Sequence, residues 1–177
     1  MTAKTASQQG AASRRKGASA EREAIRLLAA HGIVARRSAS MQAARIRSGV
    51  KVPDLICEAP HDYLWIEVKA TKAPSAVWEG LAQAQQGLDG ADRDGVPLVL
   101  YKAPRKPWVA AVPNGCADVG DFHAVVPAGS MAEAVRLTHG ALAAATFPMV
   151  DVIAKAHPRV YVGPAVVVIA SLTRLKK

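Results

Sequence analysis

The chain has 177 residues, half of them hydrophobic, and a formal net charge of +9. This length suits one main domain with a buried core, or one domain with a small appendage. The longest apolar run, Ala165–Leu172, is too short to cross a membrane, so we expect a soluble protein without a membrane partner. Cys57 and Cys116 have neither metal-ligand spacing nor the density of a disulfide scaffold, which favours the reducing cytoplasm.

The positive charge is confined to the first third of the chain. Residues 1–53 contain eleven Lys or Arg and only two acidic residues, whereas the remainder is neutral. A one-sided basic segment is typical of polyanion binding, because each neutralised phosphate releases a condensed counterion. For residues 1–16 alone, a solvating basic tail explains the charge equally well. The side chains predicted to contact DNA are Arg14, Arg15, Lys16, Arg36, Arg37, Ser40, Arg45, Arg47 and Lys51.

The first predicted elements are a basic arm, a helix and a strand. Residues 1–16 lack apolar periodicity and are predicted to form a flexible arm. This segment also has the composition of an organellar transit peptide, an alternative that ranks second because no cleavage-like break precedes the helix. The helix is predicted over Ala18–His31 and ends at Gly32. A strand, Ile33–Ser38, and a flexible polar loop, Ser40–Val52, follow.

The middle of the chain has the pattern of a hairpin, a helix and two further strands. The strands Asp54–Glu58 and Tyr63–Thr71 are joined by turn residues and should pair as a hairpin. Val77–Leu88 has apolar residues along one helical face. Leu98–Lys102 and Trp108–Val112 are predicted as strands. This order predicts an α/β domain over residues 17–113, with a mixed central sheet flanked by helices.

After Pro113 the composition changes to Gly, Pro and small apolar residues. Ser130 and Glu133 have capping-box spacing and should start a helix that runs to about Thr146. Val160–Leu172 is strand-like. We expect residues 114–177 to form a small C-terminal α/β extension, which completes the sheet or supplies a dimer surface.

Two acidic side chains and a lysine are predicted to converge on the hairpin. Alternation along the second strand places Trp65, Glu67 and Lys69 on one face. Asp54 opens the first strand, so the hairpin brings its carboxylate to the same end of the sheet. Trp65 is expected to cover the end of the core, and stacking on a base or sugar is the alternative.

These residue types suit metal-assisted hydrolysis of a phosphodiester. Mg²⁺ takes oxygen ligands, keeps several waters and needs only one or two carboxylates. Asp54 and Glu67 can supply those carboxylates, and the backbone carbonyl of Val68 is a further candidate ligand. Lys69 can orient or deprotonate the attacking water, or stabilise charge on the phosphate.

A third carboxylate is predicted on the first helix. Glu21 falls between Ile25 and Leu28 in the middle of the apolar face, where an unpaired charge is costly. A metal-bound water in the same cluster would give it a partner. Glu23 is the rival for this role, but it points nearer the flank of the apolar face.

Each of these motifs is common alone, but their order along the chain is specific. Lys16-Gly17 precedes Glu21-Arg22, and Pro53-Asp54 and Ile66-Glu67-Val68-Lys69 follow. This series resembles the PD-(D/E)xK, or restriction-endonuclease-like, superfamily, and most closely the archaeal-type Holliday junction resolvases and related small phage nucleases. The resemblance covers residues 14 to about 112. Residues 78–84 and Pro107-Trp108 are similar to the phage members in particular.

The resemblance implies a metal-dependent DNA endonuclease with a restriction-endonuclease-like fold. It implies that the catalytic positions are Glu21, Asp54, Glu67 and Lys69, with Mg²⁺ bound by the acids and Mn²⁺ able to replace it. Gln83 or Gln85 would correspond to a glutamine that lies near the resolvase site. It also implies branched DNA as substrate, a homodimer that cuts opposite strands, and a cytoplasmic protein encoded by a prokaryote or a phage.

Two features depart from the resolvase pattern. The segment Ser38–Val52 is longer than the corresponding Gly and Ser loop, and the tail after Pro113 has no recognised counterpart. One alternative function is therefore a nuclease of the same chemistry that acts on flaps, single strands or a specific duplex site. The other is a non-catalytic DNA-binding protein that retains the fold.

Overall fold

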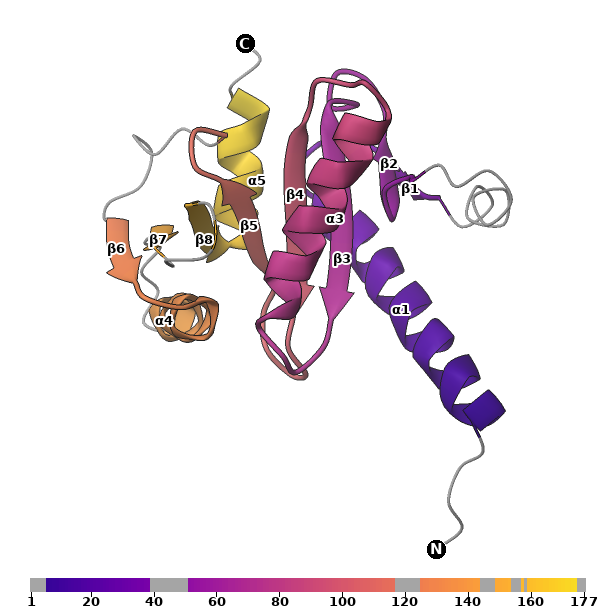
Figure 1. Ribbon diagram of the computed structural model, residues 1–177, viewed down its shortest axis with the longest axis horizontal. Coiled ribbons are helices and arrows are strands. Elements are labelled where there is room, and N and C mark those ends of the chain that lie inside the picture. The colour runs from indigo at the N-terminus through magenta and orange to yellow at the C-terminus, as the bar shows by residue number, and fades with distance from the viewer. Residues whose placement is uncertain are drawn as a thin grey trace, which may run out of the picture.

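One mixed sheet runs through the molecule (Figure 1). The structure is a computed structural model that describes residues 6–38, 51–116, 125–143, 149–153, 157 and 159–174. The strands are β1 (Ala35–Arg37), β2 (Leu55–Cys57), β3 (Leu64–Ala70), β4 (Val96–Lys102), β5 (Val109–Pro113), β6 (Val125–Ala128), β7 (Met149–Val152) and β8 (Val160–Pro164). The helices are α1 (Ala6–Ala29), α3 (Ala76–Gly90), α4 (Met131–Ala143) and α5 (Ala165–Arg174).

The eight strands of the described residues lie in the order β1-β2-β3-β4-β5-β8-β7-β6. The pairs β3–β4 and β6–β7 are parallel, and the other neighbours are antiparallel. This arrangement confirms the predicted α/β fold with a mixed central sheet. The antiparallel pairing of β2 with β3 is the hairpin that the turn residues predict.

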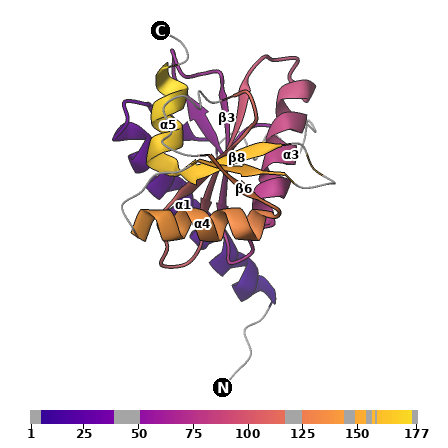
Figure 2. The same cartoon turned by 90° about the vertical axis from the view of Figure 1, so that its left-hand side faces the viewer.

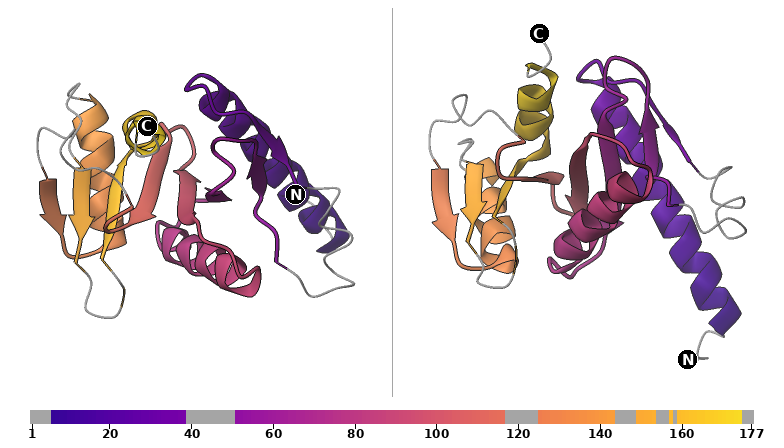
Figure 3. Two further views of the ribbon diagram at one scale, coloured as in Figure 1. Left: turned by 90° about the horizontal axis from the view of Figure 1, so that it is seen from above. Right: turned by 45° about the horizontal axis from the view of Figure 1, so that its top comes forward.

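Helices cover both faces of the sheet, as Figures 2 and 3 show for α3 and α5 and for α1 and α3. Ala24 and Leu28 of α1 share a buried cluster with Ile169 and Leu172 of α5. The opposite face packs against α3 and α4. The side chains of β3 alternate between the two faces as predicted, because Leu64 and Ile66 lie in the α1 cluster and Trp65 packs against α3.

Strand β3 extends beyond its antiparallel neighbour. Strand β2 pairs only with its first half, with Leu55 opposite Ile66 and Ile56 opposite Trp65. Strand β4 pairs with β3 along its full length, to Ala70. The second half of β3 therefore has an edge that β2 does not cover, and the predicted catalytic residues of β3 lie in this half.

The first helix is longer than predicted. Helix α1 begins at Ala6, so the expected start at Ala18 is wrong, and residues 6–16 of the predicted arm are helical. Its N-terminal part runs away from the body of the molecule (Figure 1). Ala, Gln, Arg and Lys favour helix, and elongation from a packed helix is much easier than nucleation. The absence of apolar periodicity therefore indicates that this segment does not pack against the core. It does not indicate that the segment is non-helical.

The strand prediction for Val160–Leu172 is half wrong, because β8 ends at Pro164 and α5 begins at Ala165. The buried apolar residues of α5 follow helical spacing; they are Ala165, Val168, Ile169 and Leu172. The run of β-branched residues favours strand locally. Burial of one helical face against the α1 side of the sheet overrides that preference.

The predicted start of the helix after Ser130 agrees with the structure, whereas its predicted end at about Thr146 lies outside the described residues. The backbone N–H of Glu133 donates to Ser130 Oγ at 3.2 Å, which is the predicted capping contact at the start of α4. Residues 114–177 were expected to complete the sheet or to supply a dimer surface. The described strands β6, β7 and β8 do complete the sheet. Cys57 and Cys116 are free thiols.

No helix in the described ranges is long and apolar enough to cross a membrane.

Candidate active site at the uncovered edge of β3

Asp54 hydrogen-bonds to β3 just beyond the point where the pairing of β2 with β3 ends. The backbone N–H of Asp54 donates to the carbonyl of Ile66 at 3.0 Å, and the N–H of Val68 donates to Asp54 Oδ2 at 2.9 Å. A strand residue points its N–H and C=O to the same edge. The carbonyl of Val68 therefore faces the uncovered edge, beside Asp54, and is available to a ligand there.

Glu67 lies within hydrogen-bonding reach of Asp54, and its side chain is only 9% exposed. Burial, followed by the negative charge of Asp54, raises the pKa of Glu67 to about 7. Lys69 and the indole of Trp65 act in the opposite direction. Two carboxylates are thus held together in a poorly solvated place, which is unfavourable unless a proton or a cation joins them.

Lys69 is fixed by two oxygen-bearing side chains. Its Nζ lies 3.6 Å from Glu67 Oε2 and donates to Gln83 Oε1 of α3 at 2.5 Å. Gln85 instead donates to Asp89 on the exposed side of the same helix. Of the two glutamines that the resemblance suggests, Gln83 is therefore the one that lies at the site.

Ser38, at the end of β1, holds the backbone of the Pro-Asp motif. Its side chain is fully buried, and its hydroxyl donates to the carbonyl of Pro53 and, at 3.3 Å, to that of Asp54. Its own N–H donates to the carbonyl of Asp54 at 3.1 Å. Ser38 therefore fixes the position from which the Asp54 side chain starts.

Trp65 supports Glu67 from within the core. Its indole N–H donates to Glu67 Oε1 at 3.3 Å, and the residue as a whole is 4% exposed. The expectation that Trp65 covers the end of the core is met. Gly87 of α3 makes room for the ring, because a Cβ there would lie 2.1 Å from Trp65 Cζ2. Gly80 does the same for Lys69, whose Cε would lie 3.0 Å from an added Cβ.

The two glutamates of α1 have different partners. Glu21 forms an ion pair with Arg37 of β1, and its side chain is 14% exposed. Glu23 pairs with Lys102 and accepts the indole N–H of Trp108 at 3.1 Å. The hydrogen bond from Lys102 lowers the pKa of Glu23. The carboxylate of Glu23 is therefore held by side chains at the end of β4 and just before β5. Glu21 does have the partner that its position requires, but that partner is Arg37.

The donor set of this site fits a hard divalent cation. Among the described residues, no three His, Cys, Asp or Glu side chains are grouped so as to hold a metal ion. Mg²⁺ does not need such a group, because it keeps several waters and takes one or two carboxylates. Asp54, Glu67 and the Val68 carbonyl provide three oxygen ligands, and a cation between the carboxylates would remove their repulsion.

The predicted DNA-contacting residues fall into several groups. Arg14, Arg15 and Lys16 are exposed on the projecting part of α1. Arg36 lines a pocket on the α3 face, as does Lys51, which also donates to Gln86. Arg37 is paired with Glu21. Those that lie outside the described residues are Ser40, Arg45 and Arg47, together with most of the predicted loop Ser40–Val52.

Sequence reasoning missed the supporting roles of Ser38, Gly80 and Gly87. A serine next to a polar loop gives no sign of burial. The two glycines do carry a signal, because they lie seven residues apart on one face of α3 and glycine is unfavourable within a helix. Glycine at such positions indicates a close approach by another element.

The comparison with protein families shows the family to which the chain belongs. A sequence profile described as archaeal Holliday junction resolvase (Hjc) matches residues 12–146. The chain belongs to this family. The match extends past Pro113, into residues for which the sequence had suggested no counterpart. The Hjc family belongs to the PD-(D/E)xK superfamily, and membership makes the protein a structure-specific DNA endonuclease that acts on Holliday junctions.

A solved structure of Hjc from Archaeoglobus fulgidus, a Holliday junction resolvase from an archaeal hyperthermophile, is also similar. It is 26% identical, the alignment covers 54% of this chain and 70% of the other, and the TM-score is 0.36. No curated protein matches the chain significantly.

Proposed function

We propose that this Hjc-family protein cleaves branched DNA by Mg²⁺-dependent hydrolysis at the uncovered edge of β3. Asp54, Glu67 and the Val68 carbonyl would hold the ion, and Mn²⁺ would replace it. The single observation that carries the proposal is the buried contact between Asp54 and Glu67, which raises the pKa of Glu67 to about 7. Such a pair, with an open backbone carbonyl beside it, suits a cation.

The bound ion would supply a Lewis acid for the phosphate and for the attacking water. Lys69 is proposed to orient that water and to stabilise charge on the phosphate, because its ammonium is held beside Glu67. Gln83 Oε1 accepts a hydrogen bond from one N–H of the Lys69 ammonium and so fixes the direction of the other two N–H groups. Glu21, held by Arg37, is proposed to orient water at the same site.

Cleavage assays test the proposal. A labelled four-way junction, with duplex, flap and single-stranded controls, is incubated with Mg²⁺, Mn²⁺ or EDTA, using wild type and Lys69→Ala. Paired symmetric nicks on the junction that need metal and fall about 10²–10⁴-fold in the variant would support the proposal. Cutting of a control substrate in preference to the junction would move the substrate to flaps, single strands or duplex. Metal-independent binding without any cutting would favour a DNA-binding protein that retains the fold.

We also propose that the protein acts as a homodimer, because two sites are needed to cut opposite strands of one junction. Mixing experiments test this. Heterodimers of wild-type and Lys69→Ala subunits should nick one strand of the junction and leave the partner strand intact. A monomer in sedimentation experiments at nuclease-active concentrations would count against the dimer. We expect a cytoplasmic site of action, in keeping with the two free thiols.

A further inference from the structure

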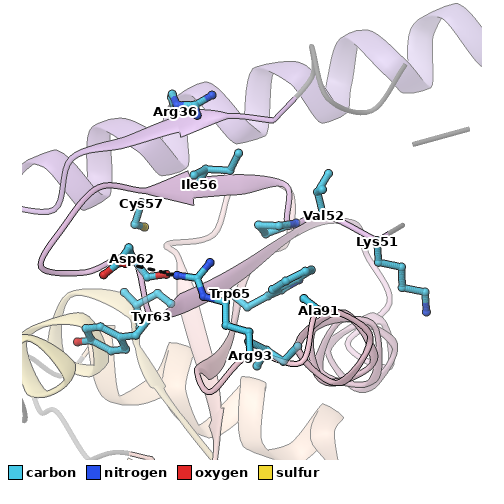
Figure 4. Close-up of a pocket in the computed structure, with 13 residues that line it drawn as sticks. Arg36, Lys51, Val52, Ile56, Cys57, Asp62, Tyr63, Trp65, Ala91 and Arg93 are labelled. Atoms are coloured by element: carbon cyan, nitrogen blue, oxygen red, sulfur yellow. Dashed lines mark hydrogen bonds and ion pairs between the residues drawn. The ribbon is translucent and has the colours of Figure 1, made fainter. Parts of the chain in front are cut away.

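A pocket of about 310 Å³ adjoins the Asp54–Glu67 pair on the α3 face of the sheet (Figure 4). It lies between the β1–β2 edge and the C-terminal end of α3. Its inner wall includes Ile56, Trp65 and Leu88, and its lining is mostly apolar. The residues assigned to catalysis do not line it, so the mechanism leaves this pocket without a role.

The mouth of the pocket is positively charged. Arg36, Lys51 and Arg93 line it together with a single acidic residue, Asp62. Arg93 is paired with Asp62 at 3.5 Å, and Lys51 donates to Gln86. Arg36 forms no ion pair with another described residue. The mouth therefore carries a net excess of cations, which suits a polyanion that presents an apolar group.

The pocket and the cleavage site share a wall. Trp65 lines the pocket and donates its indole N–H to Glu67 at 3.3 Å, and Pro53 of the lining immediately precedes Asp54. A phosphate at the two carboxylates would thus place its neighbouring nucleotide at the mouth of this pocket. The volume, at the lower end of ligand pockets, suits one small planar group rather than a long side chain or peptide.

We propose that this pocket receives one unstacked base of the DNA, next to the phosphate that is cut. This rests on the nuclease function proposed above. A base in continuous duplex is stacked on both sides and must lose both stacking neighbours to enter, whereas a base at a branch point has already lost one and enters at a lower cost. Arg36 and Lys51 hold the flanking phosphates, and Ile56 and Leu88 contact the base. The pocket thereby distinguishes branched DNA from duplex without reading sequence.

Filling the pocket tests the proposal with little risk to folding. Ala91 lies exposed at its edge, just after α3, with ordinary backbone angles of φ −94° and ψ 0°. Ala91→Trp puts a large side chain into the space meant for the base. Ala132→Trp is the matched control, because Ala132 is also exposed, lies on α4 and does not line the pocket. Equal melting temperatures establish that both variants are folded.

Affinities for a four-way junction and for the same sequence as duplex are measured in Ca²⁺ at fixed salt, so that cleavage does not consume the DNA. We expect Ala91→Trp to weaken junction binding roughly ten- to a hundredfold, with duplex binding and the Ala132→Trp variant near wild type. Junctions with one abasic nucleotide near the cut then locate the base. At one position the abasic change should weaken wild type and leave Ala91→Trp no weaker than before.

Three outcomes would overturn the pocket assignment. They are junction binding by Ala91→Trp equal to that of Ala132→Trp, equal weakening of junction and duplex, and an absence of any abasic position that affects wild type. The nuclease proposal is judged separately, by metal-dependent cleavage with wild type. A wild-type protein that never cuts would overturn that proposal, while the binding data would still decide whether a base enters the pocket.

Discussion

Gln83 of α3 accepts a hydrogen bond from Lys69 of β3, so a helix side chain orients the ammonium group at the candidate site. The same helix presents Gln85, two residues on, to Asp89 and solvent. Gln85 is therefore a matched control for Gln83, because the two side chains are chemically identical and only Gln83 contacts the site.

Replacing Gln83 by Leu should therefore lower the rate of junction cleavage while leaving DNA affinity nearly unchanged. Loss of a residue that positions a catalytic group typically costs about 10–100-fold. Gln85→Leu should cleave at the wild-type rate. Single-turnover cleavage with saturating enzyme, alongside Kd in Ca²⁺, separates the two effects. Equal rates for both variants would remove Gln83 from the site.

Ser38→Ala should destabilise the protein and impair the site together. The change deletes the hydroxyl that donates to the carbonyls of Pro53 and Asp54 in a fully buried position. We expect a loss of about 1–3 kcal/mol in the free energy of unfolding, with weaker Mg²⁺ dependence of cleavage.

Ser75→Ala is the control for this loss. Ser75 is exposed before α3 and makes no side-chain capping bond, so the change should be close to neutral. Urea denaturation at pH 7.5, at about 25 °C, measures both variants. A neutral Ser38→Ala would show that other contacts hold the Pro-Asp backbone.

Glu67→Gln should stabilise the metal-free protein above neutral pH. The pKa of Glu67 is raised to about 7 in the folded state, from 4.5 ordinarily. Its contribution to stability is therefore fully present below about pH 4.5 and is lost as the pH rises through about 7. An amide does not ionise, so Glu67→Gln should have a free energy of unfolding that exceeds that of wild type by on the order of 1–3 kcal/mol at pH 8. Melting temperatures in EDTA at pH 5.5 and pH 8 measure it.

The opposite sign is expected for Glu23→Gln. Hydrogen bonding from Lys102 lowers the pKa of Glu23, so its ionised form stabilises the fold and the amide should lower the melting temperature at pH 8. Addition of Mg²⁺ should raise the melting temperature of wild type and not of Glu67→Gln. If Glu67→Gln melts lower than wild type at pH 8 in EDTA, the carboxylate pair is not strained.

Gly87→Ala should displace Trp65 and weaken its bond to Glu67. The added Cβ would lie 2.1 Å from Cζ2 and 2.5 Å from Cε2 of the indole, so the ring or the helix must move. Overpacking of this kind costs about 1–3 kcal/mol. Gly90→Ala, in the same helix with open space around it, should be neutral or slightly stabilising. Thermal unfolding and tryptophan fluorescence report on both, and an unchanged Trp65 environment in Gly87→Ala would refute the contact.

Features that depend on a short repeat along a single helix or strand were predicted correctly from the sequence. Period-two alternation placed Trp65, Glu67 and Lys69 on one face of β3, and the turn between β2 and β3 brought Asp54 beside Glu67. The capping spacing of Ser130 and Glu133 located the start of α4. These patterns are local, so tertiary contacts had little to override.

The missed features depend on what each segment packs against. The run after Pro164 contains β-branched residues that favour strand. It forms a helix because helical spacing buries one of its faces in the core beneath α5. The ion pair between Glu21 and Arg37 of β1 was not predicted, because it depends on how α1 packs beside β1. Ser38 gave no sign of burial, because the carbonyls of Pro53 and Asp54, which accept its hydrogen bonds, lie 15 and 16 residues away along the chain.

The position of β8 has a consequence for the order in which the chain assembles. Strands β6 and β7 pair with each other, and among the described strands they join the rest of the sheet only through β8, which the ribosome delivers after both. Until then the edge of β5 is open, although every residue of the candidate active site has already been made. A nascent or truncated chain that ends before Val160 would therefore hold a nearly complete nuclease beside an unprotected strand edge, the kind of surface that recruits chaperones or aggregates.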